Sequence, residues 1–214
     1  AYKLQVGHPP GAPTYLLLGN IFANFAMGDT TKVAYMMNLM SAVCSAFTIL
    51  FLFWSITAFS KRILGKIESG SQIISIMGAG LVGSLAYTFS DSFWFSAVEG
   101  EVYAMSSFFT ALVFWAALKW DDEYDREGES ANRWLILITY LIGLSIGVHM
   151  LNLLAIPAIV YMYYFKKYKT TKKGFIATGI VSIVILGFIF FGLIPQIVKC
   201  LGVVERIFVN NLGL

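Results

Sequence analysis

Two glutamates lie in a short polar segment between two apolar stretches of the chain. Glu99 and Glu101 flank Gly100, and aromatic residues stand on both sides of this segment. Ionisable groups at a membrane surface are costly unless they face a cavity or a partner, which makes them functional candidates. Positioned carboxylates of this kind act as proton acceptors. Glu101 and Glu99 are therefore candidate catalytic residues; the alternative is a solvated hairpin tip.

A rigid segment near the N-terminus carries the first of two histidines. Residues 7–13 contain three prolines and two glycines, which fix a non-helical path. Such a path could hold His8, followed by Pro9 and Pro10, at a fixed place over the membrane. The alternative is a turn that leads into a helix and carries an incidental histidine.

The second histidine lies between two apolar stretches. His149 and Asn152 are three residues apart, a spacing that predicts one shared helical face. They could line a site, or they could hydrogen-bond to neighbouring helices. The chain shows no metal-ligand spacing and no nucleotide-binding glycine loop, so we expect neither a metal nor a cofactor.

The composition decides which elements must position these residues. Of the 214 residues, 58% are hydrophobic and only 13% are charged, and the mean hydropathy is +0.74. A soluble domain carries about twice that share of charge. The net charge of +3, without a basic stripe, argues against nucleic acid as a partner. We predict an all-α, polytopic transmembrane helical bundle in contact with membrane lipids.

Apolar stretches of about 20 residues mark the spans. The uncharged stretch 134–165 would form one helix about 48 Å long, which exceeds a hydrocarbon core of about 30 Å, so we divide it at His149. Gly78, Gly80 and Gly83 predict close helix packing in the second span. The sequence predicts about six spans, near residues 33–60, 72–95, 103–120, 134–148, 150–165 and 174–195.

The distribution of Lys and Arg orients these spans. Loops 61–70, 119–133 and 166–173 hold eleven of the fifteen Lys and Arg residues and are expected to be cytoplasmic. Residues 1–32 then form an extracytoplasmic loop, in which 13–27 is an interfacial helix stopped by Gly28. Residues 196–214 form a C-terminal segment on the same outer side.

The chain begins with Ala1, lacks a signal peptide and stops without a polar tail. We interpret it as an internal piece of a longer protein.

Three segments together resemble a known family. AYKLQVGHPPGAPTYLLLGNIFANF, SFWFSAVEGEVYAMSSFFTALVFWAALKW and RWLILITYLIGLSIGVHMLNLLAIPAI occur here in family order. They resemble a bacterial membrane family of protein O-mannosyltransferase-like proteins, related to the GT-C glycosyltransferases. The resemblance covers most of residues 1–165, and His8-Pro9-Pro10 resembles the His-Pro-Pro motif of the first external loop. It implies a GT-C-like bundle in the bacterial inner membrane.

The resemblance also implies a reaction. A sugar would pass from a polyprenyl-phosphate donor, which is a substrate and not a cofactor, to an acceptor hydroxyl of a protein or glycan on the outer face. An external-loop carboxylate would act as base, and a cation would receive the lipid phosphate. His8 joins the two glutamates as a catalytic candidate. The candidate substrate-binding residues are Pro9, Pro10, Tyr103, His149, Asn152, Lys3 and Arg206.

The chain departs from the family at its start. The family's first helix and an acidic motif precede the segment that begins here at Ala1, so the piece is predicted to be catalytically incomplete. Glu101 would then shape the acceptor or sugar pocket, with His8 and His149 as supporting groups. Two alternatives stay open: a lipid or sugar transporter or flippase, and a non-catalytic membrane scaffold.

Overall fold

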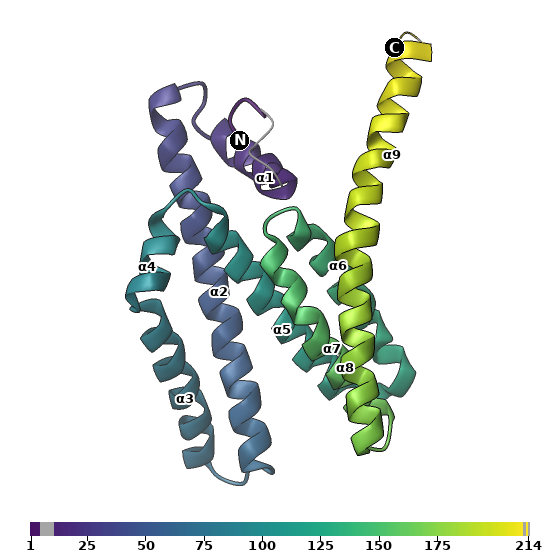
Figure 1. Ribbon diagram of the computed structural model, residues 1–214. Helices are drawn as coiled ribbons and strands as arrows, with labels where there is room; N and C mark the ends of the chain where they lie inside the picture. The colour runs from purple at the N-terminus through teal and green to yellow at the C-terminus, as the bar shows by residue number, and fades with distance from the viewer. Residues whose placement is uncertain (5–10, 212, 214) are drawn as a thin grey trace. The chain divides into compact units, whose positions relative to one another are not determined.

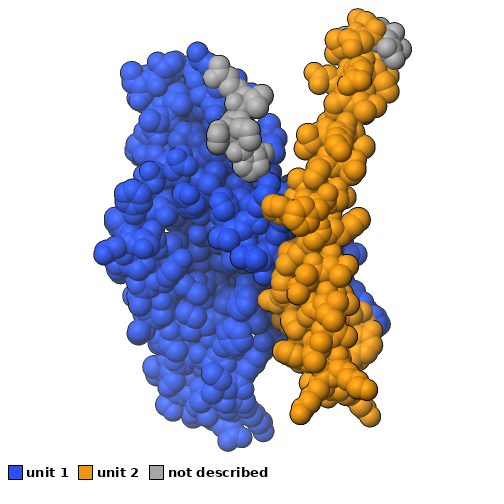
Figure 2. Space-filling view, viewed as in Figure 1, with its two compact units in different colours: residues 1–155 blue, residues 156–214 orange. Residues whose placement is uncertain are grey.

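The computed structural model describes residues 1–4, 11–211 and 213, and all regular secondary structure in these residues is helical. It divides into two compact units, residues 1–155 and residues 156–214 (Figures 1 and 2). The α-helices are α1 (Pro13–Asn24), α2 (Val33–Leu64), α3 (Gly70–Thr88), α4 (Asp91–Val98), α5 (Val102–Glu127), α6 (Arg133–Ile146), α7 (Ala155–Lys167), α8 (Lys172–Gly187) and α9 (Ile194–Arg206). Short 3₁₀ segments are η1 (Thr30–Lys32), η2 (Gly128–Asn132) and η3 (Met150–Leu154), and π-helical segments are η4 (Phe188–Leu193) and η5 (Ile207–Asn211).

The all-α prediction is confirmed, and the described part of the chain has four helical stretches long and apolar enough to cross a membrane. They are Thr30–Leu64, Gly70–Thr88, Val102–Ile146 and Lys172–Asn210. These stretches indicate a multi-pass membrane protein. The sequence predicted about six spans; Val102–Ile146 contains two of them, 103–120 and 134–148, and the predicted span 150–165 is not among the four stretches. In the structure the regions 134–148 and 150–165 form α6 and α7, of 14 and 13 residues, which are short for a hydrocarbon core of about 30 Å.

Unit 1 is built around α2, which packs against both α3 and α5 (Figure 1). The buried face of α2 includes Ser41, Ser45 and Ser55, and small residues let neighbouring helices approach closely. Gly80 and Gly83 of α3 have the same effect, because a side chain there would collide with α2. Gly78 differs from the expectation, since nothing lies within 4 Å of where its side chain would be.

The predicted span 72–95 is two helices in the structure. α3 ends at Thr88, and Ser90 has an extended backbone before the short helix α4 begins. The hydroxyl of Ser90 donates to the carbonyl of Tyr87 at 2.8 Å. Short polar side chains compete for backbone hydrogen bonds in this way, which ends helices. The polar residues of this segment therefore break the helix within an apolar stretch.

Other boundaries also differ from the expected ones. α5 continues to Glu127, well past residue 120, and α2 continues to Leu64. Residues 196–211, expected as an outer segment, are helical in α9 and η5. Between α6 and α7 the chain is interrupted at residues 147–154, where His149 adopts an extended backbone before η3.

Ion pairs join the ends of α2 and α5. One Arg62 amino nitrogen lies 2.8 Å from Asp121 and 2.7 Å from Asp122, and it also donates to the carbonyl of Leu118 at 3.3 Å. The two Lys- and Arg-containing loops 61–70 and 119–133 therefore lie at the same end of unit 1, as the orientation argument requires. We call this the basic end.

Unit 2 contains most of α7, together with α8 and α9. α7 and α8 form a hairpin in which the rings of Tyr161 and Phe175 lie 4.9 Å apart. The hydroxyl of Tyr161 also donates to the carbonyl of Phe175 at 3.1 Å. These contacts fix the α7–α8 turn, in which the third basic loop, 166–173, lies.

Candidate functional site

The N-terminus of α1 docks on the backbone of Gly147, just after α6. The amides of Thr14 and Tyr15 both point at the carbonyl oxygen of Gly147, at 2.8 and 3.3 Å. Pro13 occupies the first turn, where a missing amide hydrogen costs nothing. The Gly147 carbonyl therefore satisfies helix amides that would otherwise lack a partner. A side chain at residue 147 would collide with Thr14, so this contact requires glycine.

Tyr15 links this contact to the loop that carries the two glutamates. Its hydroxyl donates to the carbonyl of Gly100 at 2.6 Å, and its side chain is 7% exposed. Burial, together with the negative charge of Glu101, raises the pKa of Tyr15 from 10.0 to about 12. The hydroxyl thus remains protonated, and able to donate, across the physiological range. α1 therefore holds the α4–α5 loop and the turn after α6 in one place.

A Tyr15→Phe variant tests this link. Loss of a hydrogen bond of this kind costs about 1 kcal/mol, which corresponds to a drop in melting temperature of about 2–4 °C at neutral pH. Because the pKa of Tyr15 is higher in the folded state, its stabilising contribution is complete below about pH 10. That contribution is lost as the pH rises toward 12. The melting-temperature difference between wild type and Tyr15→Phe, measured in detergent, should shrink over this range.

Tyr35→Phe is the matched control, because Tyr35 is 65% exposed. It should leave the melting temperature unchanged at every pH. A Tyr15→Phe protein as stable as wild type at neutral pH would contradict the link.

The two glutamates occupy different positions on the α4–α5 loop. Glu99 directly follows α4 and is half-buried, whereas Glu101 directly precedes α5 and is exposed. The amide of Glu101 donates to the carbonyl of Glu99 at 2.8 Å, which tightens the loop. Neither carboxylate forms an ion pair with another described residue. Glu101 is therefore the more accessible of the two candidates.

His149 and Tyr103 meet at a small cavity of about 260 Å³, whose wall includes Ser92 and Ser96. The ring centroids of Tyr103 and His149 are 5.8 Å apart. Nδ1 of His149 accepts a hydrogen bond from the amide of Leu151 at 3.1 Å. In the neutral imidazole the proton is therefore on Nε2, which can donate.

Asn152 lies in η3, and its side chain faces α5; the residue is 5% exposed. Its side-chain oxygen accepts hydrogen bonds from Ser106 at 3.1 Å and Thr110 at 2.6 Å. The expectation that His149 and Asn152 share a helical face is wrong, because His149 has an extended backbone and only Asn152 lies in η3. The hydrogen bonds to Ser106 and Thr110 join η3 to α5. Asn152 is not among the described residues that line the cavity.

The remaining candidates have few or no described contacts. Lys3 is exposed. Its neighbour Tyr2 lies beside α1, because the side-chain amide of Asn20 donates to the backbone carbonyl of Tyr2 at 3.0 Å. His8, Pro9 and Pro10 lie outside the described residues. Arg206 is exposed on α9 in unit 2, whereas the other described candidates belong to unit 1.

Comparison with known proteins identifies the family. Residues 1–172 match the family model described as the protein O-mannosyl-transferase TMEM260 N-terminal domain. This is most of the chain and includes every described residue of the site in unit 1. The chain belongs to this family. The match agrees with the O-mannosyltransferase-like resemblance seen in the sequence.

Two curated relatives support the assignment to the TMEM260 N-terminal domain family. The chain is 26% identical over 165 residues to the protein O-mannosyl-transferase tmem260 of Dictyostelium discoideum, with 73% of this chain and 18% of the relative covered. It is 27% identical over 123 residues to TMEM260 of Mus musculus, with 57% and 15% covered. The chain thus spans less than a fifth of the length of these relatives. No solved structure matches it.

Sequence reasoning missed the residues that join α1 to the α4–α5 loop and to the turn after α6. Tyr15 carries a polar hydroxyl within an apolar helix, which was a weak signal of a buried partner. Gly100 and Gly147 contribute backbone carbonyls, which leave no trace in residue type. The link between α1 and the two loops could therefore not be found without the fold.

Proposed function

We propose that the full-length protein transfers mannose from a polyprenyl-phosphate donor to a hydroxyl group of an acceptor protein. The match of residues 1–172 to the O-mannosyl-transferase family carries this proposal. Because the chain covers less than a fifth of its curated relatives, the activity is proposed for the full-length protein. The site in unit 1 would form one part of its reaction centre.

The site offers groups suited to this chemistry. Glu101, exposed on its loop, would accept a hydrogen bond from the acceptor hydroxyl and favour loss of its proton. The hydroxyl oxygen forms a bond to C1 of mannose as the bond from C1 to the phosphate oxygen breaks, which inverts C1 and releases polyprenyl phosphate. Glu99 and His8 remain further catalytic candidates. Lys3 is a candidate cation for the phosphate, and Pro9 and Pro10 would shape the segment that holds His8.

The cavity beside His149 gives the donor a place to bind. Nε2 of His149 can donate to an oxygen of the sugar or phosphate. A second cavity of about 470 Å³ shares Tyr87, Ser106, Ser107 and Leu151 with the first. Its wall is mainly apolar and includes Phe59 and Phe114. We propose that the isoprenoid chain occupies this apolar cavity while the polar head group lies beside His149.

We also propose that the site faces the extracytoplasmic side. Leu17, Ile21 and Phe25 recur every four residues along α1 and its end and are 58, 53 and 60% exposed. Such a stripe suits a helix lying at a membrane surface. The basic end of unit 1 is the end away from α1 (Figure 1), and the excess of Lys and Arg there favours a cytoplasmic location.

The decisive experiment uses membranes that contain the full-length protein. Radiolabelled polyprenyl-phosphate mannose and a Ser/Thr-containing acceptor peptide should yield peptide-bound mannose that is released by β-elimination, with inverted configuration at C1. A nucleotide-linked mannose should give no direct product. Accumulation of sugar inside sealed vesicles without glycosidic product would instead favour a transporter, and neither activity would favour a scaffold.

A further inference from the structure

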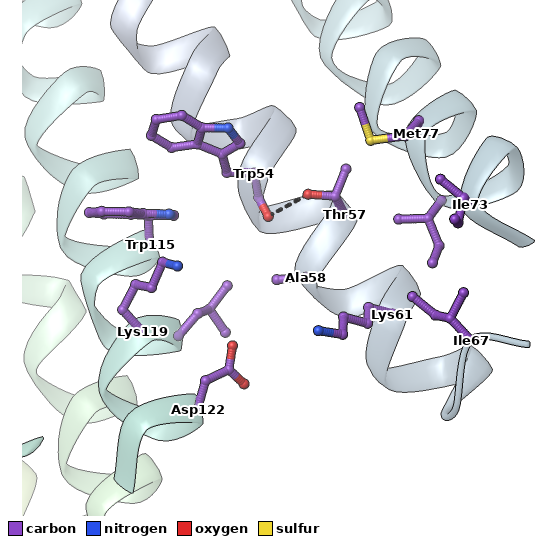
Figure 3. A pocket seen from close by; sticks show the side chains of 12 residues that line it. Trp54, Thr57, Ala58, Lys61, Ile67, Ile73, Met77, Trp115, Lys119 and Asp122 are labelled. Atoms are coloured by element: carbon purple, nitrogen blue, oxygen red, sulfur yellow. Dashed lines mark hydrogen bonds between the residues drawn. The ribbon is translucent and has the colours of Figure 1, made fainter. Parts of the chain in front are cut away.

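A third pocket lies at the basic end of unit 1 and shares no lining residue with the two cavities described above. It has a volume of about 560 Å³ and lies between α2, α3 and α5. Two lysines line it: Lys61 near the end of α2 and Lys119 in α5. Figure 3 shows their side chains reaching into the space between the helices from opposite sides.

The charge of the pocket is positive. Asp122 also lines it, but Arg62 binds Asp122 at 2.7 Å and Asp121 at 2.8 Å. Lys61 and Lys119 form no ion pair with any other described residue. Two ammonium groups therefore face a pocket in which the described carboxylate is already paired. A bound group with negative charge would complement them.

The rest of the wall is apolar and aromatic. The rings of Trp54 and Trp115 lie 5.5 Å apart, and the ammonium of Lys119 lies 5.7 Å from the centre of the Trp115 ring. On the α3 side the wall consists of Ile73, Ile76 and Met77 (Figure 3). Lysines at the ends of membrane helices, with tryptophans just inside them, are the side chains typical of the head-group region.

We propose that this pocket binds an anionic phospholipid. Its phosphate would lie between Lys61 and Lys119, and the first part of its acyl chain would lie against Trp54, Trp115 and the apolar residues of α3. A soluble phosphate shares the charge complementarity but gains nothing from the apolar wall, which is why the pocket favours a lipid. The role is separate from sugar transfer, since the pocket shares no lining residue with either of the two cavities in which we place the mannose donor.

The test is lipid titration of the detergent-purified protein, with bound lipid counted by native mass spectrometry. Phosphatidylglycerol should bind with an apparent affinity about tenfold higher than that of phosphatidylcholine, because each lysine near an anionic lipid contributes to binding and the choline cation offsets the phosphate charge of phosphatidylcholine. A Lys61→Gln/Lys119→Gln variant should lose this preference. The matched control is Lys32→Gln/Lys66→Gln, which removes the same charge from outside the pocket and should keep it.

Two further expected results and three contradicting outcomes decide the proposal. Lys61→Arg/Lys119→Arg keeps both charges and should keep the preference, which separates lipid binding from a folding defect. In the unaltered protein, phosphatidylglycerol brominated near the head of the acyl chain should quench tryptophan fluorescence more than brominated phosphatidylcholine does. Equal binding of the two lipids, a preference that survives Lys61→Gln/Lys119→Gln, or displacement of the lipid by millimolar inorganic phosphate would each overturn the proposal.

Discussion

Replacing Glu101 by glutamine in the full-length protein is expected to lower kcat/KM for mannose transfer about 100-fold. General-base catalysis by a positioned carboxylate contributes about 100-fold or more. Glutamine keeps the shape of the side chain but cannot take a proton. Because Glu101 is exposed at the start of α5, the substitution should leave the fold intact. The measurement is initial-rate transfer of mannose from polyprenyl-phosphate mannose to an acceptor peptide.

The control for this prediction is Asp91→Asn. Asp91 is an exposed carboxylate in the first turn of α4, on the same hairpin as Glu101. Its neutralisation should change kcat/KM by less than about twofold, since surface charges contribute little. Glu99→Gln compares the two neighbouring carboxylates directly. A larger loss in Glu99→Gln than in Glu101→Gln would assign the role to Glu99 and refute the prediction.

A Gly147→Ala substitution is expected to destabilise the protein and detach α1. A methyl group at residue 147 would meet the hydroxyl of Thr14 and come within 3.2 Å of its amide nitrogen. Backbone cannot move away as a flexible side chain can, so we expect a cost of about 1–3 kcal/mol. This corresponds to a decrease in melting temperature of about 2–10 °C. Amide hydrogen exchange of α1 should accelerate, and transfer activity should fall with it.

Gly143→Ala, four residues earlier and within α6, is the matched control for Gly147→Ala. Nothing lies within 4 Å of where a side chain at Gly143 would be. Alanine within a helix is more favourable than glycine by up to about 1 kcal/mol, so this variant should be neutral or more stable. The opposite sign of the two effects is the diagnostic result. Unchanged exchange in α1 of the Gly147→Ala protein would show that the docking contact does not hold α1.

Much of the architecture follows from local sequence patterns. Apolar stretches predict helices because a backbone inside a membrane must satisfy its own hydrogen bonds. Gly80 and Gly83 indicate close packing because they remove bulk from a helix surface. Helix boundaries were less well predicted. The helix break at Ser90 depends on a hydroxyl competing for a backbone carbonyl, and hydropathy alone does not report that competition.

In the candidate site, residue types could be interpreted from the sequence, but residue positions in space could not. The residue types of Glu99, Glu101 and His149 identified them as candidates in the sequence. The α4–α5 loop that carries the glutamates and the turn that leads to His149 are joined through Tyr15, whose hydroxyl binds a carbonyl 85 residues away, and through the carbonyl of Gly147, which caps α1.

The sequence by itself determined that this chain forms apolar helices with acidic and imidazole groups between them, because hydropathy and ionisation are properties of side chains. Only the tertiary structure decided that α1 joins the α4–α5 loop to the turn after α6. It also decided that Arg62 leaves Lys61 and Lys119 facing one pocket. Both arrangements depend on backbone carbonyls or on partners distant in the chain. Every residue has the same backbone carbonyl group, so the sequence does not indicate which carbonyl accepts a given hydrogen bond. The packing of the helices determines the partner.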